Sequence, residues 1–587
     1  MPLYFSEMQE INTQVAVVEP NLDDYGAYVR NFTWKYGARD LTGLPDGEGT
    51  NIAHEAVVRH AGGVLKDNVA LRWIRRDRSA KDFTYAELNA LASRFANVLT
   101  LLDVAKGDTV STLTGRIPEL YVAALGTFKT VAVFCPLHSM FGPGAVFERL
   151  RHSEAKVLVT TLDLFEKKIK SRRGQLSALK YVLLVDKDNH LDERVLSLPL
   201  LMRNASPSFA IPPTRNSDPA LLHFTSGTTG MPKAVLHGHG AVLTHLVTGR
   251  LVLDFHPGDV YWCTADPAWA TGTSYGIIAP LVNGVTNLFD EGEFDAARWY
   301  SILAEQKVNV WYTGPAAIRR LMRLPIKPRK QYDLEPLRLI SSTGEPLPAG
   351  AVRWATETFG VPVIDSWWQT ETGGIMISNY RNMPVKAGSM GKPLPGVRAA
   401  IAEITDGTFR IIQETGKDGH LVLKRGWPSM FKTYVGGDDR YVKTFHDDWY
   451  ITGDLAYRDP DGYYWFVGRS EDVIKTSGHR VGPFEVESAL LEHASVAEPA
   501  VIGKPKPAIG EIIKAFVVLK PGSAASENLK LDIAACVGSQ LGPAVAPKEI
   551  AFVDSLPKTR TGKIMRRLLK ARELELPEGD LSTLEPA

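Results

Sequence analysis

Short apolar segments alternate with amphipathic segments along most of the chain. Of all the features of the sequence, this alternation places the strongest limit on the fold of the chain. Strands that alternate with helices build parallel sheets covered by helices, so the pattern predicts an α/β protein. At 587 residues the chain is too long for one hydrophobic core, and at least two domains, in three lobes, are expected. The expected strands lie at residues 109–113, 156–160, 181–185, 221–224, 259–263, 308–312, 337–340 and 361–364.

Three of these strands run directly into segments rich in hydroxyl, glycine or tryptophan residues. The segments cover residues 225–233, 341–346 and 365–373. Because ligands of open α/β sheets bind beyond the carboxyl ends of the strands, we expect the three segments to converge on one crevice.

The segment 225–233 reads TSGTTGMPK and has the composition of a phosphate-binding turn. Its hydroxyls and backbone N–H groups can donate to an anion, and its glycines keep side chains out of the way. It is not a Walker A loop, which ends in Gly-Lys-Ser/Thr, because Pro232 stands before Lys233. An ordinary surface turn is the alternative. The segment therefore predicts binding of a nucleoside triphosphate.

The composition excludes several classes of partner. Lys and Arg (67) nearly balance Asp and Glu (66), so no overall charge favours nucleic acid or an anionic membrane. The three cysteines lie far apart, which fits neither a disulfide framework nor a zinc site. No apolar run is long enough to span a bilayer, and Glu7 interrupts the place where a signal peptide would be apolar. We expect a cytoplasmic protein.

The character of the sequence changes near residues 468–482, which predicts a domain boundary. Residues 468–472 read GRSED, a short polar connector that is typical of a hinge. An amphipathic helix at 484–491, a strand at 514–519 and a basic helix through 563–570 follow. The predicted parts are a large N-terminal domain of helix-covered sheets at 1–468, a hinge at 469–473 and a small mobile α+β domain at 474–587.

Four segments, in this order, resemble one enzyme family. Besides 225–233, the chain reads YWCTAD at 261–266, DSWWQTETG at 365–373 and PKTRTGK at 557–563. These segments are similar to those of acetyl-CoA synthetases and their short-chain relatives in the adenylate-forming superfamily. The resemblance implies that a short carboxylic acid reacts with ATP to give acyl-AMP and pyrophosphate, and that coenzyme A then displaces AMP. It also implies Mg²⁺ as cofactor and a C-terminal domain that rotates between the two steps.

The resemblance implies a nucleotide site that includes a ribose-binding carboxylate at Asp454. A sugar diol offers two donors at the spacing of carboxylate oxygens. The alternative is an aspartate with only a structural role in a turn. The implied nucleotide-binding residues are Thr225, Ser226, Gly227, Thr228, Thr229, Gly230, Lys233, Gly344, Glu345, Pro346, Asp365, Ser366, Trp367, Gln369, Thr370, Asp454, Arg469 and Arg480.

The first step brings a carboxylate against the α-phosphate, and this negative charge requires a fixed cation and a metal. The resemblance implies that Lys563 is that catalytic cation; a solvated lysine in a basic helix is the alternative. It also implies Glu371 as the Mg²⁺-facing acid, since Mg²⁺ prefers one or two carboxylates plus phosphate oxygens.

The second step needs a path for the thiol of coenzyme A. The resemblance implies that Ser477 and Gly478 line this path and that Glu471, where relatives often carry Asp, lies at the hinge. A tight turn with positive φ would explain Gly478 equally well.

Four residues are implied to form the acyl pocket: Ala270, Thr271, Thr343 and Trp368. Trp368 matches the tryptophan that closes the pocket in acetate-type enzymes, although core packing is the bland explanation for a tryptophan. Ala270 and Thr343 stand where acetate enzymes commonly have Val, which adds space and one hydroxyl. We therefore expect acetate as substrate, with tolerance for propionate or a small polar acid such as glycolate.

Two other functions stay open. One is an adenylating enzyme that loads a carrier protein instead of coenzyme A, and the other is a nonenzymatic nucleotide sensor; the presence of Lys563 and Glu371 speaks against the sensor. Because acetylation removes the charge of a lysine, a lysine acetyltransferase and a deacetylase acting on Lys563 are expected as regulatory partners.

Overall fold

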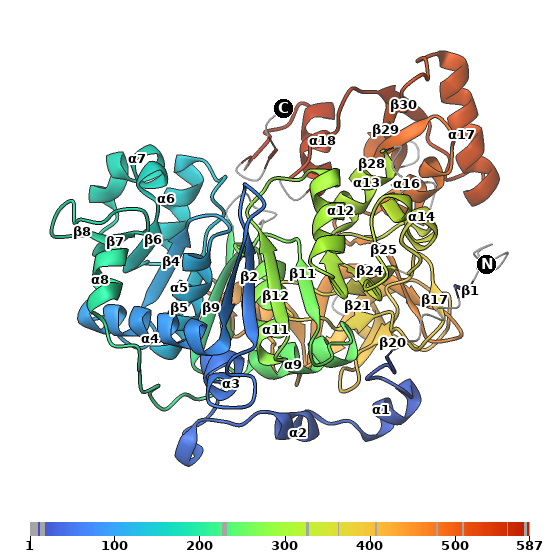
Figure 1. Ribbon diagram of the computed structural model, residues 1–587. Helices are drawn as coiled ribbons and strands as arrows, with labels where there is room; N and C mark the ends of the chain where they lie inside the picture. The colour runs from blue at the N-terminus through green and yellow to red at the C-terminus, as the bar shows by residue number, and fades with distance from the viewer. Residues whose placement is uncertain are drawn as a thin grey trace.

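The computed structural model describes residues 10–11, 18–225, 232–324, 328–361, 363–405, 408–476, 479–506, 510–559, 562–579, 581 and 584–585. The chain forms an α/β structure of large helix-flanked sheets with a small α+β unit at its C-terminal end, as predicted (Figure 1).

The first large sheet has eight strands in the order β22-β10-β9-β5-β4-β6-β7-β8 and is parallel from β9 to β8. Its strands are β4 (Thr109–Leu113), β5 (Val133–Pro136), β6 (Val157–Thr160), β7 (Tyr181–Leu184), β8 (Val195–Ser197), β9 (Pro219–Thr225), β10 (Lys233–Gly238) and β22 (Thr433–Tyr434). The helices between and before them are α4 (Tyr85–Leu101), α5 (Pro118–Lys129), α6 (Pro143–His152), α7 (Leu162–Lys168) and α8 (Leu198–Asn204).

The second large sheet has nine strands in the order β18-β16-β15-β14-β13-β11-β12-β2-β3, and β15 to β2 run parallel. Its strands are β2 (Val69–Ile74), β3 (Ala80–Thr84), β11 (Val260–Cys263), β12 (Thr286–Asp290), β13 (Val310–Thr313), β14 (Leu339–Ser342), β15 (Val363–Trp367), β16 (Ile377–Ser378) and β18 (Lys392–Pro393). Its helices are α9 (Ala241–Leu251), α10 (Ala270–Thr273), α11 (Ala279–Val282), α12 (Ala296–Glu305), α13 (Pro315–Met322) and α14 (Ala349–Phe359).

All of the strands expected from the sequence are present, each to within a few residues. Strands β4 and β6 are buried along their whole length, which is what a parallel sheet covered on both faces requires. The segment at 206–217 is a loop apart from one isolated bridge at Thr214.

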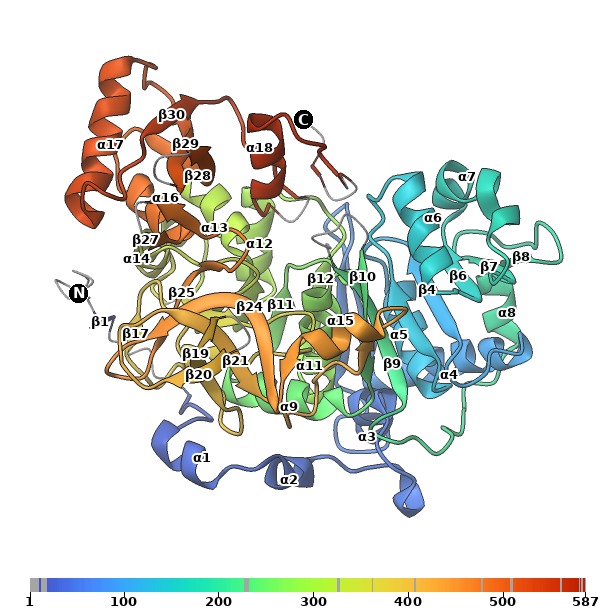
Figure 2. The same ribbon diagram turned by 180° about the vertical axis from the view of Figure 1, so that it is seen from behind.

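A third, antiparallel sheet carries the segment that leads to the predicted hinge. Its strands are β19 (Ala399–Thr405), β20 (Thr408–Ile412), β21 (Gly419–Lys424), β23 (Phe445–His446), β24 (Trp449–Arg458) and β25 (Tyr464–Arg469). Asp454 on β24 pairs with Arg469 at the end of β25, so the two residues are neighbours across the ladder. Figure 2 shows β24 and β25 leading up to the C-terminal elements.

The remaining elements are short. They are β1 (Glu10–Ile11) paired with β17 (Val385–Lys386), helices α1 (Tyr25–Asn31), α2 (Trp34–Gly37), α3 (Arg59–Ala61) and α15 (Asp438–Lys443), and the helical turns at Ala38–Asp40, Pro45–Gly47, His54–Val58, Lys170–Gln175, Ser274–Ile278 and Pro328–Lys330.

The C-terminal elements gather on top of the molecule in both ribbon views (Figures 1 and 2). They are β26 (Ile474–Thr476), β27 (His479–Val481), β28 (Val496–Lys506), β29 (Gly510–Leu519), β30 (Glu549–Phe552), α16 (Pro483–Leu491), α17 (Glu527–Leu541) and α18 (Arg566–Glu573).

One expectation for this region is wrong. The basic helix begins at Arg566 and not at Lys563. The backbone N–H of Thr559 donates to the carbonyl of Lys563 (2.7 Å), and Gly562 has a φ of +87°. The chain therefore turns just before the helix, which leaves Lys563 in a loop.

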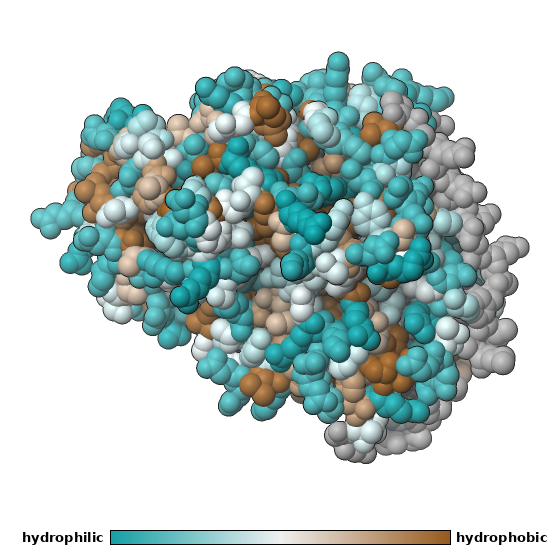
Figure 3. Space-filling view, turned by 90° about the horizontal axis from the view of Figure 1, so that it is seen from below, coloured by the Kyte–Doolittle hydropathy of each residue, from teal (hydrophilic) through white to brown (hydrophobic). Residues whose placement is uncertain are grey.

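None of the helices in the described part of the chain is long and apolar enough to cross a membrane. On the face seen from below, hydrophobic and hydrophilic residues are interspersed (Figure 3).

Candidate active site

Two of the three predicted loops meet where β14 and β15 end. Ser342 and Asp365 are partners in the ladder, and beyond them the Thr343 hydroxyl donates to the Ser366 carbonyl (3.1 Å). The backbone N–H of Leu347 donates to the Asp365 carboxyl (3.3 Å). Burial raises the pKa of Asp365 to about 8, so this carboxyl is mostly protonated at neutral pH. Asp365 thus holds the backbone of Leu347, the residue directly after Gly344, Glu345 and Pro346.

The third loop, at residues 226–231, lies outside the described residues, but both of its ends are defined. Thr225 ends β9, and Lys233 begins β10 as its direct partner. The Lys233 ammonium lies 5.7 Å from the centre of the Tyr434 ring, and the Tyr434 hydroxyl donates to the Glu371 carboxylate (2.9 Å). The end of the predicted phosphate turn therefore lies near the acid predicted to face Mg²⁺.

Asp454 is the centre of a hydrogen-bond cradle. The carboxylate is buried, with Arg469 donating to one oxygen (2.7 Å) and Trp367 and Gln369 donating to the other (2.9 Å each). The Gln369 amide is itself held by the Thr452 carbonyl and the Tyr450 hydroxyl (2.9 Å each). Although burial opposes its charge, Asp454 raises the pKa of Arg469. A carboxylate fixed by three donors keeps its orientation before any ligand arrives.

Lys563 reaches this cradle from the C-terminal unit. Its side chain is exposed to solvent, yet the surrounding protein partly desolvates it and, with Arg469, lowers its pKa. Glu345 and Asp454 act in the opposite direction. These opposing charges all act on the Lys563 ammonium. Among the described residues, the Lys563 ammonium forms no hydrogen bond or ion pair, while its backbone N–H donates to the Thr559 hydroxyl (3.1 Å).

Helix α13 fixes the position of the Lys563 turn. Gly562 packs on Ala316, and a Cβ at Gly562 would lie 2.4 Å from the Ala316 Cβ. About two turns further along, at the C-cap of the helix, Arg323 forms an ion pair with Glu498 of β28, which also accepts from Lys558 (2.6 Å). The C-terminal unit is therefore seated on α13 through a close contact and a charged pair.

The predicted acyl-pocket residues come from three elements. Ala270 and Thr271 open α10, Thr343 follows β14 and Trp368 follows β15. The Trp368 ring lies edge-to-face on Tyr275, with ring centres 5.3 Å apart. Its indole N–H donates to the Tyr312 hydroxyl (3.2 Å). Trp368 is half-buried, so one side is left for a ligand.

Comparisons with known proteins identify the family. A model of the family described as "AMP-binding enzyme" matches residues 58–435, and one described as "AMP-binding enzyme C-terminal domain" matches residues 485–563. The chain belongs to the AMP-binding enzyme family. Within this family it is an acetyl-CoA synthetase-like, AMP-forming ligase.

Several relatives of this AMP-binding enzyme are similar over nearly their whole length. Acetyl-coenzyme A synthetase of Bacillus subtilis is 44% identical over 96% of this chain and 98% of its own, and that of Methanothrix thermoacetophila is 38% identical over 91% and 84%. The solved acyl-CoA synthetase of Brucella canis is 33% identical, with a TM-score of 0.73 over 94% of this chain and 99% of its own. An anthranilate CoA ligase solved with anthranoyl-AMP is 29% identical, with a TM-score of 0.80 over 91% and 98%.

Some predicted site residues of this AMP-binding enzyme contribute no described side chain. Ser226, Gly227, Thr228, Thr229, Gly230, Ser477 and Gly478 lie outside the described residues, and Arg480 is described only as backbone in β27. Glu471 is exposed in the turn closed by a bond from the Asp472 N–H to the Arg469 carbonyl (3.0 Å). The Thr370 carbonyl accepts from the Gly373 N–H (3.1 Å) in the turn before Gly374.

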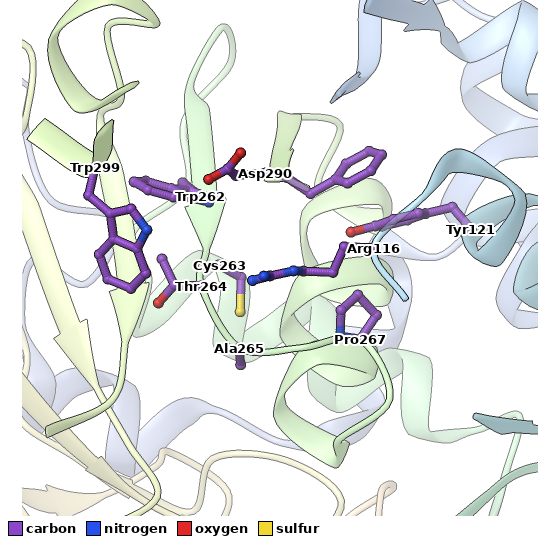
Figure 4. Close-up of a pocket in the computed structure, with 10 residues that line it drawn as sticks. Arg116, Tyr121, Trp262, Cys263, Thr264, Ala265, Pro267, Asp290 and Trp299 are labelled. Carbon is purple, nitrogen blue, oxygen red and sulfur yellow. The ribbon is translucent and has the colours of Figure 1, made fainter. Parts of the chain in front are cut away.

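A small cavity behind β11 is a separate feature (Figure 4). It is lined by Arg116, Tyr121, Trp262 and Cys263 among others, and its volume of about 10 Å³ is that of a single water molecule. Burial raises the pKa of the Cys263 thiol to about 12, so the thiol stays protonated. This cavity is too small for a nucleotide or an acyl group.

The residues that sequence reasoning missed are mostly tyrosines. Tyr312, Tyr434 and Tyr450 hold Trp368, Glu371 and Gln369 respectively. The sequence could have indicated Tyr312, because it ends the expected strand 308–312. That strand lies beside β14, and β14 and β15 both lead into the site. Tyr434 and Tyr450 come from distant segments, so their proximity depends on the tertiary fold.

Proposed function

We propose that the protein ligates a short-chain carboxylic acid to coenzyme A in two steps, with acyl-AMP as intermediate and AMP and pyrophosphate as products. Acetate is the proposed main acid, with propionate and glycolate as further substrates. The observation that supports the proposal is that the turn before Lys563 packs on α13, with Gly562 against Ala316, and that Arg319 of the same helix donates to Glu345 (2.8 Å).

In the first step, Lys563 contacts the carboxylate of the acid and the α-phosphate of ATP. Both groups are negative, and a fixed ammonium in a partly desolvated cleft stabilises the charge that accumulates as they approach. The phosphate turn, from Thr225 to Lys233, holds the other phosphates. Electrons of the acid oxygen form the new bond to phosphorus while the bond to pyrophosphate breaks.

Mg²⁺ fits this site through Glu371. Tyr434 donates to one carboxylate oxygen, and within the described part of the chain the other oxygen accepts no hydrogen bond. That part also contains no group of three or more His, Cys, Asp or Glu side chains that could hold a metal. One carboxylate plus phosphate oxygens of the substrate is a set that Mg²⁺ accepts, and the ion would neutralise phosphate charge.

Asp454 binds the ribose of the nucleotide. An ionised carboxylate offers about four acceptor positions, and three are filled by Arg469, Trp367 and Gln369. Binding both ribose hydroxyls therefore requires one donor to give way. Arg469 is the candidate because its side chain is 36% exposed and it lies at the predicted hinge.

The acyl pocket selects a short chain because Trp368 closes it. Ala270 leaves more room than Val would, and Thr343 offers a hydroxyl in place of a methyl, which supports propionate and glycolate beside acetate. A change of one methylene in a pocket is worth only about 1–3 kcal/mol, so several short acids are expected to react.

In the second step, the C-terminal unit rotates about Glu471, within the hinge 469–473, and opens the path past Ser477 and Gly478 to the thiol. The thiol sulfur bonds to the acyl carbon and the bond to AMP breaks. Acyl transfer to a carrier protein is the alternative, and a thioester assay that depends on added coenzyme A separates the two.

The charge of Lys563 also offers a point of control. Acetylation by a lysine acetyltransferase would remove the cation and stop the first step, and a deacetylase would restore it. An acetylated preparation that kept full activity would exclude this regulation. The predicted compartment remains the cytoplasm.

The proposed acid range is tested by initial rates with acetate, propionate, glycolate and butyrate at fixed ATP and coenzyme A. We expect acetate to react fastest, with propionate and glycolate measurable and butyrate slowest. An initial rate with butyrate that exceeds the rates with the other three acids would exclude Trp368 as the end of the pocket.

A further inference from the structure

A directed chain of hydrogen bonds runs behind Trp368. The Trp368 indole N–H donates to the Tyr312 hydroxyl (3.2 Å), which lies 3.2 Å from the Ser366 hydroxyl. The Ser366 hydroxyl donates to the Ser342 carbonyl (2.8 Å). Since a hydroxyl has one hydrogen, Ser366 must accept from Tyr312. Each donor in the chain therefore has one partner, and the direction from Trp368 to Ser342 is fixed.

The same ring is held from a second side. Tyr275 packs edge-to-face on both Trp368 and Tyr312, with ring centres 5.3 Å and 5.4 Å apart. The Tyr275 hydroxyl accepts from the Ile375 N–H (2.7 Å) and lies 3.0 Å from the Thr248 hydroxyl. Tyr275 and Tyr312 are almost completely buried. The indole of Trp368 is thus positioned by one hydrogen bond and one aromatic contact, both on immobile groups.

Thr343 belongs to this arrangement as well. Its hydroxyl hydrogen is used by the Ser366 carbonyl (3.1 Å), so toward a ligand the oxygen can only accept. A substrate hydroxyl such as that of glycolate could donate to it, whereas a substrate carbonyl would find no donor there.

We propose that Tyr312 is a positioning residue for acid length: its hydroxyl fixes Trp368 as a rigid end of the acyl pocket. This inference rests on the proposed function, in which Trp368 closes that pocket. Tyr312 needs no contact with the acid itself, since it acts through the orientation of the indole.

The physical reason is the cost of a buried donor without a partner. Removing the Tyr312 hydroxyl leaves the indole N–H of Trp368 without its acceptor. A turn of the ring toward another acceptor or toward solvent would then restore a hydrogen bond to the indole N–H. Either movement lengthens the pocket, so the discrimination between acetate and butyrate weakens.

The test compares Tyr312→Phe with the parent enzyme, using the ratio of kcat/KM for acetate to kcat/KM for butyrate. We expect the ratio to fall about tenfold, the effect of losing discrimination against a methylene or two. Ser366→Ala, which removes the acceptor of the Tyr312 hydroxyl, should lower the ratio in the same direction and guards against a Tyr312 variant that fails to fold.

Tyr300→Phe is the matched control. Tyr300 is also buried, but its hydroxyl has no hydrogen-bond partner in the described structure, so its removal should leave the ratio unchanged. A general loss of packing would move both variants alike and would contradict the proposal, as would an unchanged ratio in both Tyr312→Phe and Ser366→Ala.

Trp368→Gly separates this inference from the function beneath it. If Trp368→Gly accepts butyrate while Tyr312→Phe does not, the pocket assignment stands and the positioning role of Tyr312 is wrong. If Trp368→Gly also rejects butyrate, Trp368 does not end the pocket and both proposals fail.

Discussion

At the scale of single residues, the site depends on groups that are oriented before substrates bind. Asp454 accepts from Arg469, Trp367 and Gln369, and Gln369 is in turn fixed by Tyr450 and by a backbone carbonyl. Such prior orientation limits the reorganisation that binding requires to the displacement of one donor, for which Arg469 is the candidate.

Asp454→Asn should weaken nucleotide use. Asparagine keeps one acceptor oxygen but places an amide against one of the former donors and leaves Arg469 without its anion. Hydrogen bonds to charged groups are worth about 1.5–3 kcal/mol, so kcat/KM for ATP should fall roughly 10- to 100-fold. Steady-state kinetics with varied ATP measure this. Asp188→Asn, at a side chain that is 87% exposed, is the control; an equal effect there would refute the assignment.

Residue identities were predictable where a local motif carried the chemistry, and unpredictable where contacts came from afar. Lys563, Asp454 and Trp368 stand in recognisable segments. Arg319, which donates to Glu345 (2.8 Å), and Tyr434, which donates to Glu371, are separated from their partners by intervening strands and helices. Only the folded chain brings such pairs together.

At the scale of elements, helix α13 connects the predicted nucleotide site with the C-terminal unit. Arg319 donates to Glu345, while Ala316 packs on Gly562 and Arg323 pairs with Glu498. These contacts belong to the arrangement in which the turn before Lys563 packs on α13. Their loss should shift the balance toward other orientations of the C-terminal unit.

Glu498→Gln should slow the first step and leave the second unaffected. Partly exposed ion pairs contribute about 0–1 kcal/mol, so a decrease of roughly two- to fivefold in acetate-dependent ATP–pyrophosphate exchange is expected. Thioester formation from supplied acetyl-AMP should keep its rate. The control is Glu549→Gln, whose partners Lys504 and Lys514 lie in the same unit. Equal slowing of both steps by Glu498→Gln would contradict this role.

The elements themselves were predictable to within a few residues because apolar segments mark buried strands. Their ends were less so. β14 and β15 continue through Ser341, Ser342 and Asp365, since the ladder of backbone hydrogen bonds extends into the polar residues of the site. The start of α18 was missed because nothing in the basic composition indicates the turn at Gly562.

At the scale of the whole molecule, burial in the packed interior keeps several histidines neutral. Burial lowers the pKa of His223 and His239 to about 3 and that of His237 and His245 to about 4. In the unfolded chain these groups titrate near 6.5. Below that pH the unfolded state binds more protons than the folded state, so the stability decreases as the pH falls from about 6.5 toward 4.

Each of these histidines should reduce the free energy of unfolding by about 1.4 kcal/mol per pH unit within that window. Urea unfolding at several pH values between 5 and 7.5 measures the slope. The Ile52 N–H donates to the His239 ring (3.1 Å), and the side-chain oxygen of asparagine can replace that acceptor. His239→Asn should therefore reduce the dependence of the unfolding free energy on pH by the contribution of one histidine. Stability that is independent of pH from 5 to 6.5 would show that the histidines are not neutral in the folded protein.

The most direct measurement is that of both half-reactions in Lys563→Ala. With the cation removed from the cleft, acetate-dependent ATP–pyrophosphate exchange should fall roughly a hundredfold or more, because a fixed charge at the transition state is worth several kcal/mol. Formation of acetyl-CoA from supplied acetyl-AMP and coenzyme A should proceed at the rate of the parent enzyme, since the lysine has left the site by then. Equal loss of both activities, or retention of the exchange, would contradict the account in which the C-terminal unit delivers Lys563 for the first step alone.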